Sequence, residues 1–451
     1  MGINILQWSD DDLFGAFQQT FLVGWAPVAI FIMATAGFAL LYAGMVRKKN
    51  VSHTIIIINV GWTLGFFIYY IIGFPLAYYT DGQFLGIPKW LPTIPNPLPP
   101  YLNDTGGAYG LPASPSGLGD MSLWFKMAMF CITCVAIVPG ATAERDKFWG
   151  FIIAAGVITG FIYPLIEHWV WGGGWLSSGI LGGYNLIDYA GSGVVHMTGG
   201  FLGLTGAIMI GPRIGKFVGK GRAPRTFFGH SIPLSVIGAW LLVFGWFGFN
   251  IGSSVATDPE TINIELSWVS ITTAMAMAGG LFGAAITSRG HVLTSMIGLL
   301  SGAVSICSGA ALMHPIAAFI VGIVAGIITT FFYGLLEHKL KIDDALAVFP
   351  VHGACGVWGL VATGIFGVDI LGAHPVYGFS TGDWLPQLGV QVLGAIGIGA
   401  SIFGMGLLMF FVLKKLNLLR VSKDQELFGL DISFHKTYAY PEEEANKPFF
   451  R

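Results

Sequence analysis

The stretch IDYAGSGVVHMTGG (187–200) places one histidine, His196, inside one of the most apolar parts of the chain. A second stretch, DDALAVFPVHGACGVWGL (343–360), repeats its spacing around His352. In both, an aspartate stands eight residues before the histidine, a valine directly precedes it, and glycines follow after four and seven residues. Two matched stretches of this kind indicate an internal repeat.

The composition predicts a membrane protein. Of the 451 residues, 54% are hydrophobic and only 10% are charged, whereas roughly a quarter of the residues in a typical soluble domain are charged. The 65 glycines favour helices that pack closely in a bilayer. The formal net charge of −2 and the lack of a sustained basic tract in a polar context argue against nucleic acid as a partner.

Apolar runs long enough to cross about 30 Å of hydrocarbon recur along the chain. They predict an all-α polytopic membrane protein with 11 transmembrane helices, near 21–46, 54–79, 121–142, 148–168, 189–211, 230–252, 268–288, 292–312, 315–335, 345–367 and 385–413. The first run follows an acidic N-terminal stretch and is too long for the core of a signal peptide, so we expect it to span the membrane.

Basic residues set the predicted orientation. If the runs cross the membrane in turn, 20 of the 22 lysines and arginines fall on one side, and only Lys89 and Lys126 fall on the other. Short cytoplasmic loops collect Lys and Arg, so we expect the N-terminus outside and the C-terminus inside a cell (inner or plasma) membrane. The Pro-rich segment 87–103 is then an exterior loop, and its Asn103 begins a glycosylation sequon that matters only in a eukaryotic cell.

The repeat divides a transmembrane domain at 1–415 into two five-helix halves, about 21–211 and 230–367. The eleventh helix follows at about 385–413, and 416–451 is a cytoplasmic tail. An odd number of spans separates the halves, so the second half is inverted relative to the first. Inverted repeats whose polar groups meet at the repeat interface are typical of transporters.

The same geometry predicts the depth of the two histidines. Eight residues of helix advance about 12 Å, and half of the hydrocarbon thickness is about 15 Å. Because one aspartate marks an outer helix end and the other an inner helix end, His196 and His352 are expected near the midplane, approached from opposite faces.

Three roles are open to the histidine pair. Each ring could be a hydrogen-bonded core residue without further function. A metal site is the second alternative, but no carboxylate or thiolate with ligand spacing shares either helix, so we expect no metal. The third role, a pathway or proton relay, is common for rare ionisable residues inside membranes, and paired imidazoles can pass a proton by exchanging donor and acceptor roles. We favour the relay.

The acidic residues before the histidines also have alternatives. Asp343 and Asp344 stand at an inner helix start, where a carboxylate can cap the helix, and we favour that role. Asp188 could cap its helix in the same way, or it could help to draw a cation inward from the exterior. The sequence leaves both roles open for Asp188.

The four cysteines lie inside apolar segments rather than in a polar loop, at positions Cys131, Cys134, Cys307 and Cys355. A disulfide framework is therefore not expected. Cys131 and Cys134 have a spacing found in redox and metal motifs, but in an apolar helix we interpret them as small packing residues.

Several motifs resemble the ammonium transporter (Amt/Rh) family. DYAGSGVVHMTGG and VHGACGVWG are similar to its two histidine motifs. Further similarities are GATAER (140–145), HWVWGGGW (168–175), GWFGFNIGS (245–253) and the tail ELFGLDISFHKTYAY (426–440). The resemblance covers nearly the whole chain and implies a homotrimer with one pore per subunit.

The resemblance also implies roles for individual residues. Phe130 and Phe249 would close the outer pore. A recruitment site would consist of Trp171, Ser253 and Phe130, with Asp188 supporting it or assisting deprotonation. His196 and His352 would be the twin histidines of the pore and proton relay.

Two positions depart from the family pattern. Ala347 stands where many relatives carry an acid before the second histidine, which bears on the inner exit. Lys436 replaces a glycine common in the tail motif, which bears on the docking of a cytosolic PII-type regulator.

The function implied is ammonium transport. Ammonium would be recruited at an outer vestibule and deprotonated, ammonia would pass through an apolar pore, and the proton would travel separately by the histidines. The alternative is an ammonium sensor that uses the same site and the tail as its output. An enzyme is not expected, because no set of nucleophile, base and orienting group occurs, and no cofactor is implied.

Overall fold

The computed structural model describes residues 19–78, 80, 82–84, 119–219, 223–254 and 259–441. In these ranges ten helices are long and apolar enough to cross a membrane, and Val292–Ile306 is a shorter apolar helix. The segment at 87–103, with Asn103, lies outside the described residues.

The helices follow the predicted order of spans. The first half contains α2 (Ala26–Ile32), α3 (Phe38–Met45), α4 (Val51–Ile68), α5 (Phe74–Tyr78), α6 (Gly119–Ile137), α7 (Pro139–Thr142), α8 (Phe148–Val157), α9 (Tyr163–Val170) and α10 (Thr198–Ile210). The second half contains α11 (Ile232–Ile251), α12 (Pro259–Ser288), α13 (Val292–Ile306), α14 (Pro315–Gly334) and α15 (Cys355–Phe366). After it come α16 (Trp384–Lys415) and α17 (Lys423–Phe428). Two short strands, β1 (Phe217–Val218) and β2 (Ala223–Pro224), pair antiparallel between the halves.

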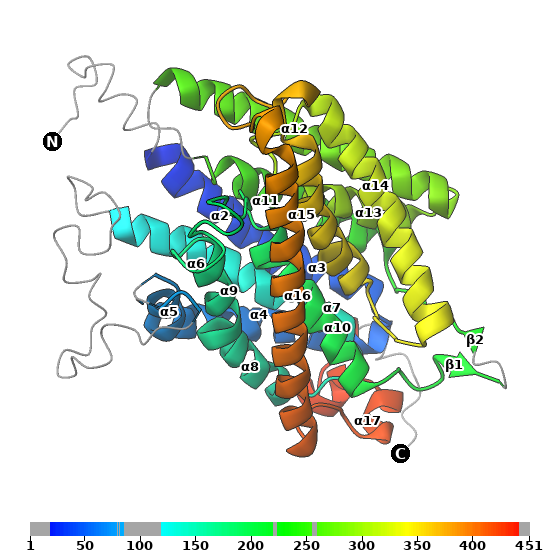
Figure 1. Ribbon diagram of the computed structural model, residues 1–451. Coiled ribbons are helices and arrows are strands. Elements are labelled where there is room, and N and C mark those ends of the chain that lie inside the picture. The colour runs from blue at the N-terminus through cyan, green and yellow to red at the C-terminus, as the bar shows by residue number, and fades with distance from the viewer. Residues whose placement is uncertain are drawn as a thin grey trace, which may run out of the picture.

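The last long helix joins the two halves. Figure 1 shows α16 running down the height of the molecule in front of the other helices. It packs on α10 from the first half and on α15 from the second. These two helices carry the sequence repeats, so α16 packs against both of them.

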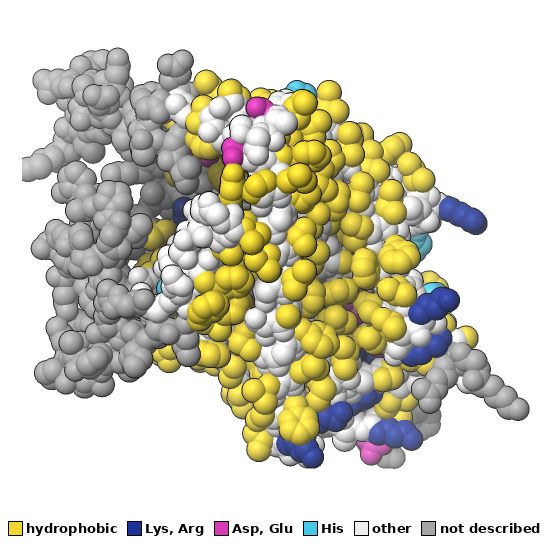
Figure 2. All heavy atoms as spheres, in the orientation of Figure 1, with side chains coloured by type: hydrophobic (Ala, Val, Ile, Leu, Met, Phe, Trp, Pro, Cys, Tyr) yellow, Lys and Arg dark blue, Asp and Glu magenta, His cyan; other side chains and the backbone are white. Residues whose placement is uncertain are grey.

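The surface has the polarity expected of a membrane protein. Figure 2 shows a broad apolar face, with the lysines and arginines gathered toward its lower and right margins. Trp149, Phe331 and Leu408 are each more than 60% exposed. Side chains of this size suit contact with lipid, because lipid tails are as apolar as the side chains themselves.

Glycines let α12 and α14 approach closely. A Cβ added to Gly279 would lie 2.1 Å from the carbonyl oxygen of Phe319, and one added to Gly283 would lie 2.2 Å from that of Ile323. Both distances are far below van der Waals contact, so no larger residue fits at this crossing without separating the helices.

One predicted span is too long. The eighth run was expected to continue to 312, but α13 ends at Ile306 and turns follow it. The end is held by Ser192, whose hydroxyl donates to the Val304 carbonyl (2.7 Å) and accepts from the Ser308 backbone N–H (2.8 Å). Non-helical backbone at membrane depth is tolerated where it is buried in protein, and residues 307–312 are all buried.

Candidate functional site: an aromatic file ending at two histidines

The fold brings the two repeat histidines into contact. His196 lies in the π-helical segment Ser192–Met197, which leads into α10, and His352 lies in Phe349–Ala354, which leads into α15. π-Helical turns are frequent at functional sites. The two Nδ1 atoms are 3.3 Å apart, and the rings stack with centroids 5.4 Å apart and planes 25° apart. Both side chains are buried.

The aspartates begin the two histidine segments. The Asp188 carboxylate accepts from the backbone amides of Gly193 and Val194, both at 2.9 Å. Asp344 accepts from Val348 (2.9 Å) and Phe349 (2.7 Å). Both carboxylates therefore cap the helical segments that follow them. Capping is the role favoured for Asp344 from the sequence and one of the two roles left open for Asp188.

Burial sets the protonation of the two capping carboxylates. It raises the pKa of Asp188 to about 6, although the backbone amides of Val194 and Gly193 oppose the shift. It raises the pKa of Asp344 to about 6 in the same way, against the amides of Phe349 and Val348. Near pH 7 both groups are therefore mainly carboxylates that accept from amides.

Aromatic rings form a continuous file from the outer face to the histidines. Trp171 contacts Phe130 with ring centroids 5.7 Å apart. Phe130 and Phe249 stack at 4.4 Å with an interplanar angle of 24°. Phe249 in turn lies 5.6 Å from the His196 ring. Phe130 and Phe249 are almost fully buried, so their stacked rings fill the space above the histidine pair.

Ser253 and Asp188 attach to this file through backbone groups. The Ser253 hydroxyl donates to the carbonyl of Phe249 (2.8 Å), which leaves the lone pairs of its oxygen able to accept. The Trp171 indole N–H donates to the carbonyl of Asp188 (2.8 Å). Asp188 therefore fixes the orientation of the Trp171 ring with its backbone, while its side chain caps a helix.

Two further aromatic residues, Trp246 and Phe38, contact the histidine pair. Trp246 stacks on His196 at 5.2 Å and donates its N–H to Cys307 Sγ (3.2 Å). Phe38 lies 6.0 Å from the His352 ring on the other side of the pair. Trp246 could have been found, because it lies within the GWFGFNIGS motif. No local signal marks Phe38.

The histidine pair retains hydrogen-bonding capacity. His196 Nε2 is buried and has no hydrogen-bond partner among the described residues. A small polar molecule beside the His196 ring could therefore form a hydrogen bond with Nε2. All four cysteines are unbridged and buried, and within the described ranges no three His, Cys, Asp or Glu side chains converge as metal ligands.

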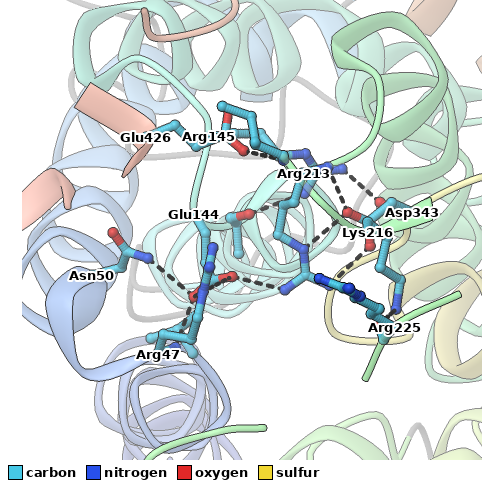
Figure 3. A network of polar contacts seen from close by, with 12 residues as sticks. Arg47, Asn50, Glu144, Arg145, Arg213, Lys216, Arg225, Asp343 and Glu426 are labelled. Atoms are coloured by element: carbon cyan, nitrogen blue, oxygen red, sulfur yellow. Dashed lines mark hydrogen bonds and ion pairs between the residues drawn. The ribbon is translucent and has the colours of Figure 1, made fainter. Parts of the chain in front are cut away.

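A buried ionic network closes the inner side of the helix bundle. In Figure 3, Glu144 lies between Arg47 and Arg213, and Arg213 also reaches Asp343 from the second half. Burial alone would raise the pKa of Glu144, but Arg213 and Arg47 hold it at about 2. Arg145 and Arg213 likewise hold the pKa of Asp343 below its usual range despite burial. These carboxylates are therefore ionised and tie the inner ends of both halves together.

The C-terminal tail packs on the same inner face. The Leu430 N–H donates to Asn50 Oδ1 (3.0 Å), and the Asp431 carboxylate accepts from the backbone of His53 (2.8 Å). Glu426 accepts from the backbone of Ile214 (2.6 Å). The tail thus contacts two separate inner loops.

Both departures from the family pattern occupy strained backbone. Ala347 has φ 61° and Lys436 has φ 54°, and the left-handed region is unfavourable for residues with a Cβ. A glycine adopts this conformation readily, which explains why glycine suits the position of Lys436.

Known proteins are similar to this sequence over nearly its whole length. A family model described as the Ammonium Transporter Family matches residues 21–440. The chain belongs to the ammonium transporter family. It is 39% identical over 430 residues to ammonium transporter Amt1 of Methanocaldococcus jannaschii, covering 94% of this chain and 97% of that relative. It is 36% identical to ammonium transporter Amt2 of Archaeoglobus fulgidus, covering 92% and 87%.

Solved structures related to the ammonium transporter family have the same fold. One titled Sensor Amt Protein matches with a TM-score of 0.79 at 29% identity, over 93% of this chain and 99% of that one. Candida albicans Mep2 matches with a TM-score of 0.73 at 24% identity, over 90% and 87%, which is a likeness of fold. Family membership and the apolar helices make the chain a multi-pass membrane protein.

Proposed function

We propose that this chain transports ammonium by separating it into ammonia and a proton. The names of its relatives point to transport rather than catalysis. The observation that carries the mechanism is the contact between His196 and His352 at the end of the aromatic file. Ammonia passes along the file, and the proton passes along the histidines.

Recruitment begins at Trp171. A cation over an indole ring gains roughly 0.5–2 kcal/mol, and the Ser253 oxygen can accept a hydrogen bond from the ion. The Trp171 ring is held in place by its bond to the Asp188 carbonyl, so little ordering is required when the ion arrives. Phe130 lies against the same indole and completes the site on the pore side.

Deprotonation is energetically competitive with carrying the ion whole. A charge at the membrane centre costs about 2.5–3.5 kcal/mol on insertion scales, and more than about 10 kcal/mol in simulations of isolated helices. Removing a proton from an amine whose pKa is near that of lysine costs roughly 4.6 kcal/mol at pH 7. Deprotonation therefore costs less than moving the charge to the membrane centre as simulations estimate it, and the neutral ammonia that results crosses without the charge penalty.

The same step provides selectivity. Potassium is similar in size to ammonium, but it has no proton to release and no hydrogen bond to donate. The stacked rings of Phe130 and Phe249 present an apolar barrier that favours a neutral molecule. A potassium ion would have to cross this barrier with its full charge.

The histidine geometry supports the relay. Each neutral imidazole carries one proton, so across the 3.3 Å contact one Nδ1 donates and the other accepts. Protonation of the unpartnered His196 Nε2 would allow the shared proton to move to His352. His352 then carries a proton on each ring nitrogen and releases the Nε2 proton toward the inner side. After that release the pair holds the opposite arrangement of tautomers, and one proton has been moved inward.

Replacing both histidines tests the relay. In proteoliposomes, His196→Ala with His352→Ala is expected to lower ammonium-evoked current at least about tenfold. Replacement of the exposed His291 by alanine is the matched control and should leave the current unchanged. An unaltered current in the double variant would show that the proton does not use the pair.

The assembly and its regulation are further parts of the proposal. We infer a homotrimer with one pore per subunit and a PII-type regulator at the tail, both on the basis of the family resemblance. Native mass spectrometry of the purified protein tests the trimer. A pull-down with a PII-type protein, with and without the tail substitution Lys436→Gly, tests the regulator.

A sensor is the second candidate function. It is favoured by the similarity to the structure titled Sensor Amt Protein and by the docked tail, which could report occupancy of the site. Flux of methylammonium into vesicles separates the two candidates. A transporter gives saturable uptake, whereas a sensor binds the same cation without net uptake.

A further inference from the structure

A buried carboxylate lies near the outer end of α9, outside the aromatic file. Glu167 has no exposed surface and accepts hydrogen bonds from the hydroxyls of Tyr69 (2.8 and 3.0 Å) and Tyr78 (3.1 Å). Among the described residues, no lysine, arginine or histidine makes an ion pair with it.

An ionised carboxylate in this position lacks compensation. The penalty for burying an unpaired charge is several kcal/mol, and two tyrosine donors recover only part of it. The carboxylate therefore requires either a bound proton or a bound cation.

The other half of the molecule shows what such a site can hold. Tyr-Pro-Leu-Ile-Glu-His at 163–168 and Tyr-Gly-Leu-Leu-Glu-His at 333–338 occupy the fourth span of each half. In the second copy, Glu337 accepts from the Tyr333 hydroxyl (3.0 Å) and forms an ion pair with the ammonium group of Lys216. The repeated carboxylate thus binds a primary ammonium ion that is tethered to the chain.

The first copy has the same oxygen groups without the lysine. Tyr163 corresponds to Tyr333, and its buried hydroxyl has no hydrogen-bond partner among the described residues. The Tyr163 ring lies 6.3 Å from that of Tyr69, which already binds Glu167. Tyr78 is only partly buried, so a small ion could enter the site past the Tyr78 side chain.

We propose that Glu167, with the hydroxyl oxygens of Tyr69, Tyr78 and Tyr163, binds a free ammonium-type cation at the outer face. The ion takes the place that the Lys216 ammonium occupies in the second half. It donates N–H bonds to the carboxylate and to the unpartnered Tyr163 oxygen, which acts as an acceptor. The site lies one helical turn before Trp171 but shares none of the residues assigned to the pore, and it does not depend on the proposed transport mechanism.

Thermal unfolding in detergent tests the site, because a ligand that binds only the folded state raises the melting temperature. A Trp171→Ala background removes the recruitment site. In the Trp171→Ala protein, ammonium or methylammonium chloride is expected to give a Tm about 2 °C higher than sodium chloride gives at equal ionic strength. Adding Glu167→Gln should abolish the rise, and Tyr163→Phe, which loses only an unpartnered hydroxyl, should at least halve it.

Two results would overturn the proposal. Glutamine has the shape of a protonated glutamic acid, so an unchanged ammonium-dependent rise in the Glu167→Gln protein would mean that Glu167 simply carries a proton. An equal rise with potassium chloride would remove the assignment to an ammonium-type cation. If Glu167→Gln does not fold, Tyr163→Phe decides alone. Currents from the histidine variants are measured separately, so failure of the transport mechanism leaves this test unaffected.

Discussion

Gly200 lies against the backbone of Gly353 so closely that a Cβ on Gly200 would be 2.1 Å from the Gly353 nitrogen. Gly353 directly follows His352, and Gly200 follows His196 by four residues. The contact is therefore the place where the two repeat segments cross. It allows the imidazoles to approach within hydrogen-bonding distance.

Replacing Gly200 by alanine is expected to destabilise the protein by about 1–3 kcal/mol, the usual effect of overpacking a core. The added methyl group must separate the two segments, so ammonium-evoked current should fall as well. Gly334 is the matched control, since no atom of the described ranges lies within 4 Å of a Cβ placed there. Gly334→Ala should leave Tm equal or higher, because alanine favours helix. Equal Tm values for the two variants would contradict the tight crossing.

Ser192→Ala is expected to cost about 1–3 kcal/mol. The substitution leaves the Val304 carbonyl and the Ser308 N–H without the hydroxyl that binds both, and buried unsatisfied polar groups are costly. Ser288→Ala is the control, because the Ser288 hydroxyl is buried with no hydrogen-bond partner among the described residues. Denaturation of both variants in detergent checks the difference, and an equal loss of stability would show that Ser192 does not hold the end of α13.

Stability should fall as pH rises from about 4 to about 7 because of Asp146. Burial raises its pKa from the ordinary 3.8 to about 7, although Arg145 and Thr142 lower it. The folded protein therefore holds the proton more tightly than the unfolded chain. This contribution is complete below about pH 4 and is lost as the pH rises through about 7. His53 Nε2 lies 3.9 Å from the carboxylate, and the backbone around Asp146 pairs antiparallel with the backbone around Arg420.

Melting curves of Asp146→Asn between pH 4 and pH 8 check this sign. The variant should come close to the wild type near pH 4 and exceed it near pH 8 by on the order of 1 kcal/mol or more, since one pKa unit is worth about 1.4 kcal/mol. Asp424→Asn, at an exposed position in the tail, should show no such crossover. A wild-type advantage at pH 8 would mean that the ionised carboxylate is stabilising.

Lys436→Gly is expected to stabilise docking of the tail by about 1 kcal/mol, because it removes a Cβ from a left-handed residue. Hydrogen exchange of the tail amides should slow accordingly. Lys423→Gly is the opposing control. Lys423 begins the helical segment α17, and glycine is a poorer helix former than lysine. Faster exchange in the Lys436→Gly protein would show that the lysine side chain itself supports docking.

Much of the fold follows from the sequence because the thickness of hydrocarbon dictates the length of each apolar run. The end of α13 cannot be predicted from the sequence, because residues 307–312 are nearly as apolar as the helix before them. The break is made by Ser192, which lies more than 100 residues away in the chain. A contact of this range leaves no mark on the local pattern.

The site is predictable where the repeat preserves spacing. His196 and His352 share their offsets from aspartate and glycine, so they stand out. Phe38 is one of 35 phenylalanines, and only the folded structure places it beside His352. Glu167 and Glu337 were overlooked for another reason, because one lies 29 residues before its histidine and the other only 15. A longer connection in the first half hides the match.

The hydrogen bond between Asn50 and Leu430 joins positions 380 residues apart in the chain. A ribosome must therefore have made almost all of the protein before the first inner loop can receive its partner. The helices can insert one after another during synthesis, but the inner face is completed only when translation is nearly finished. A nascent chain stalled before Leu430 should carry an open inner surface.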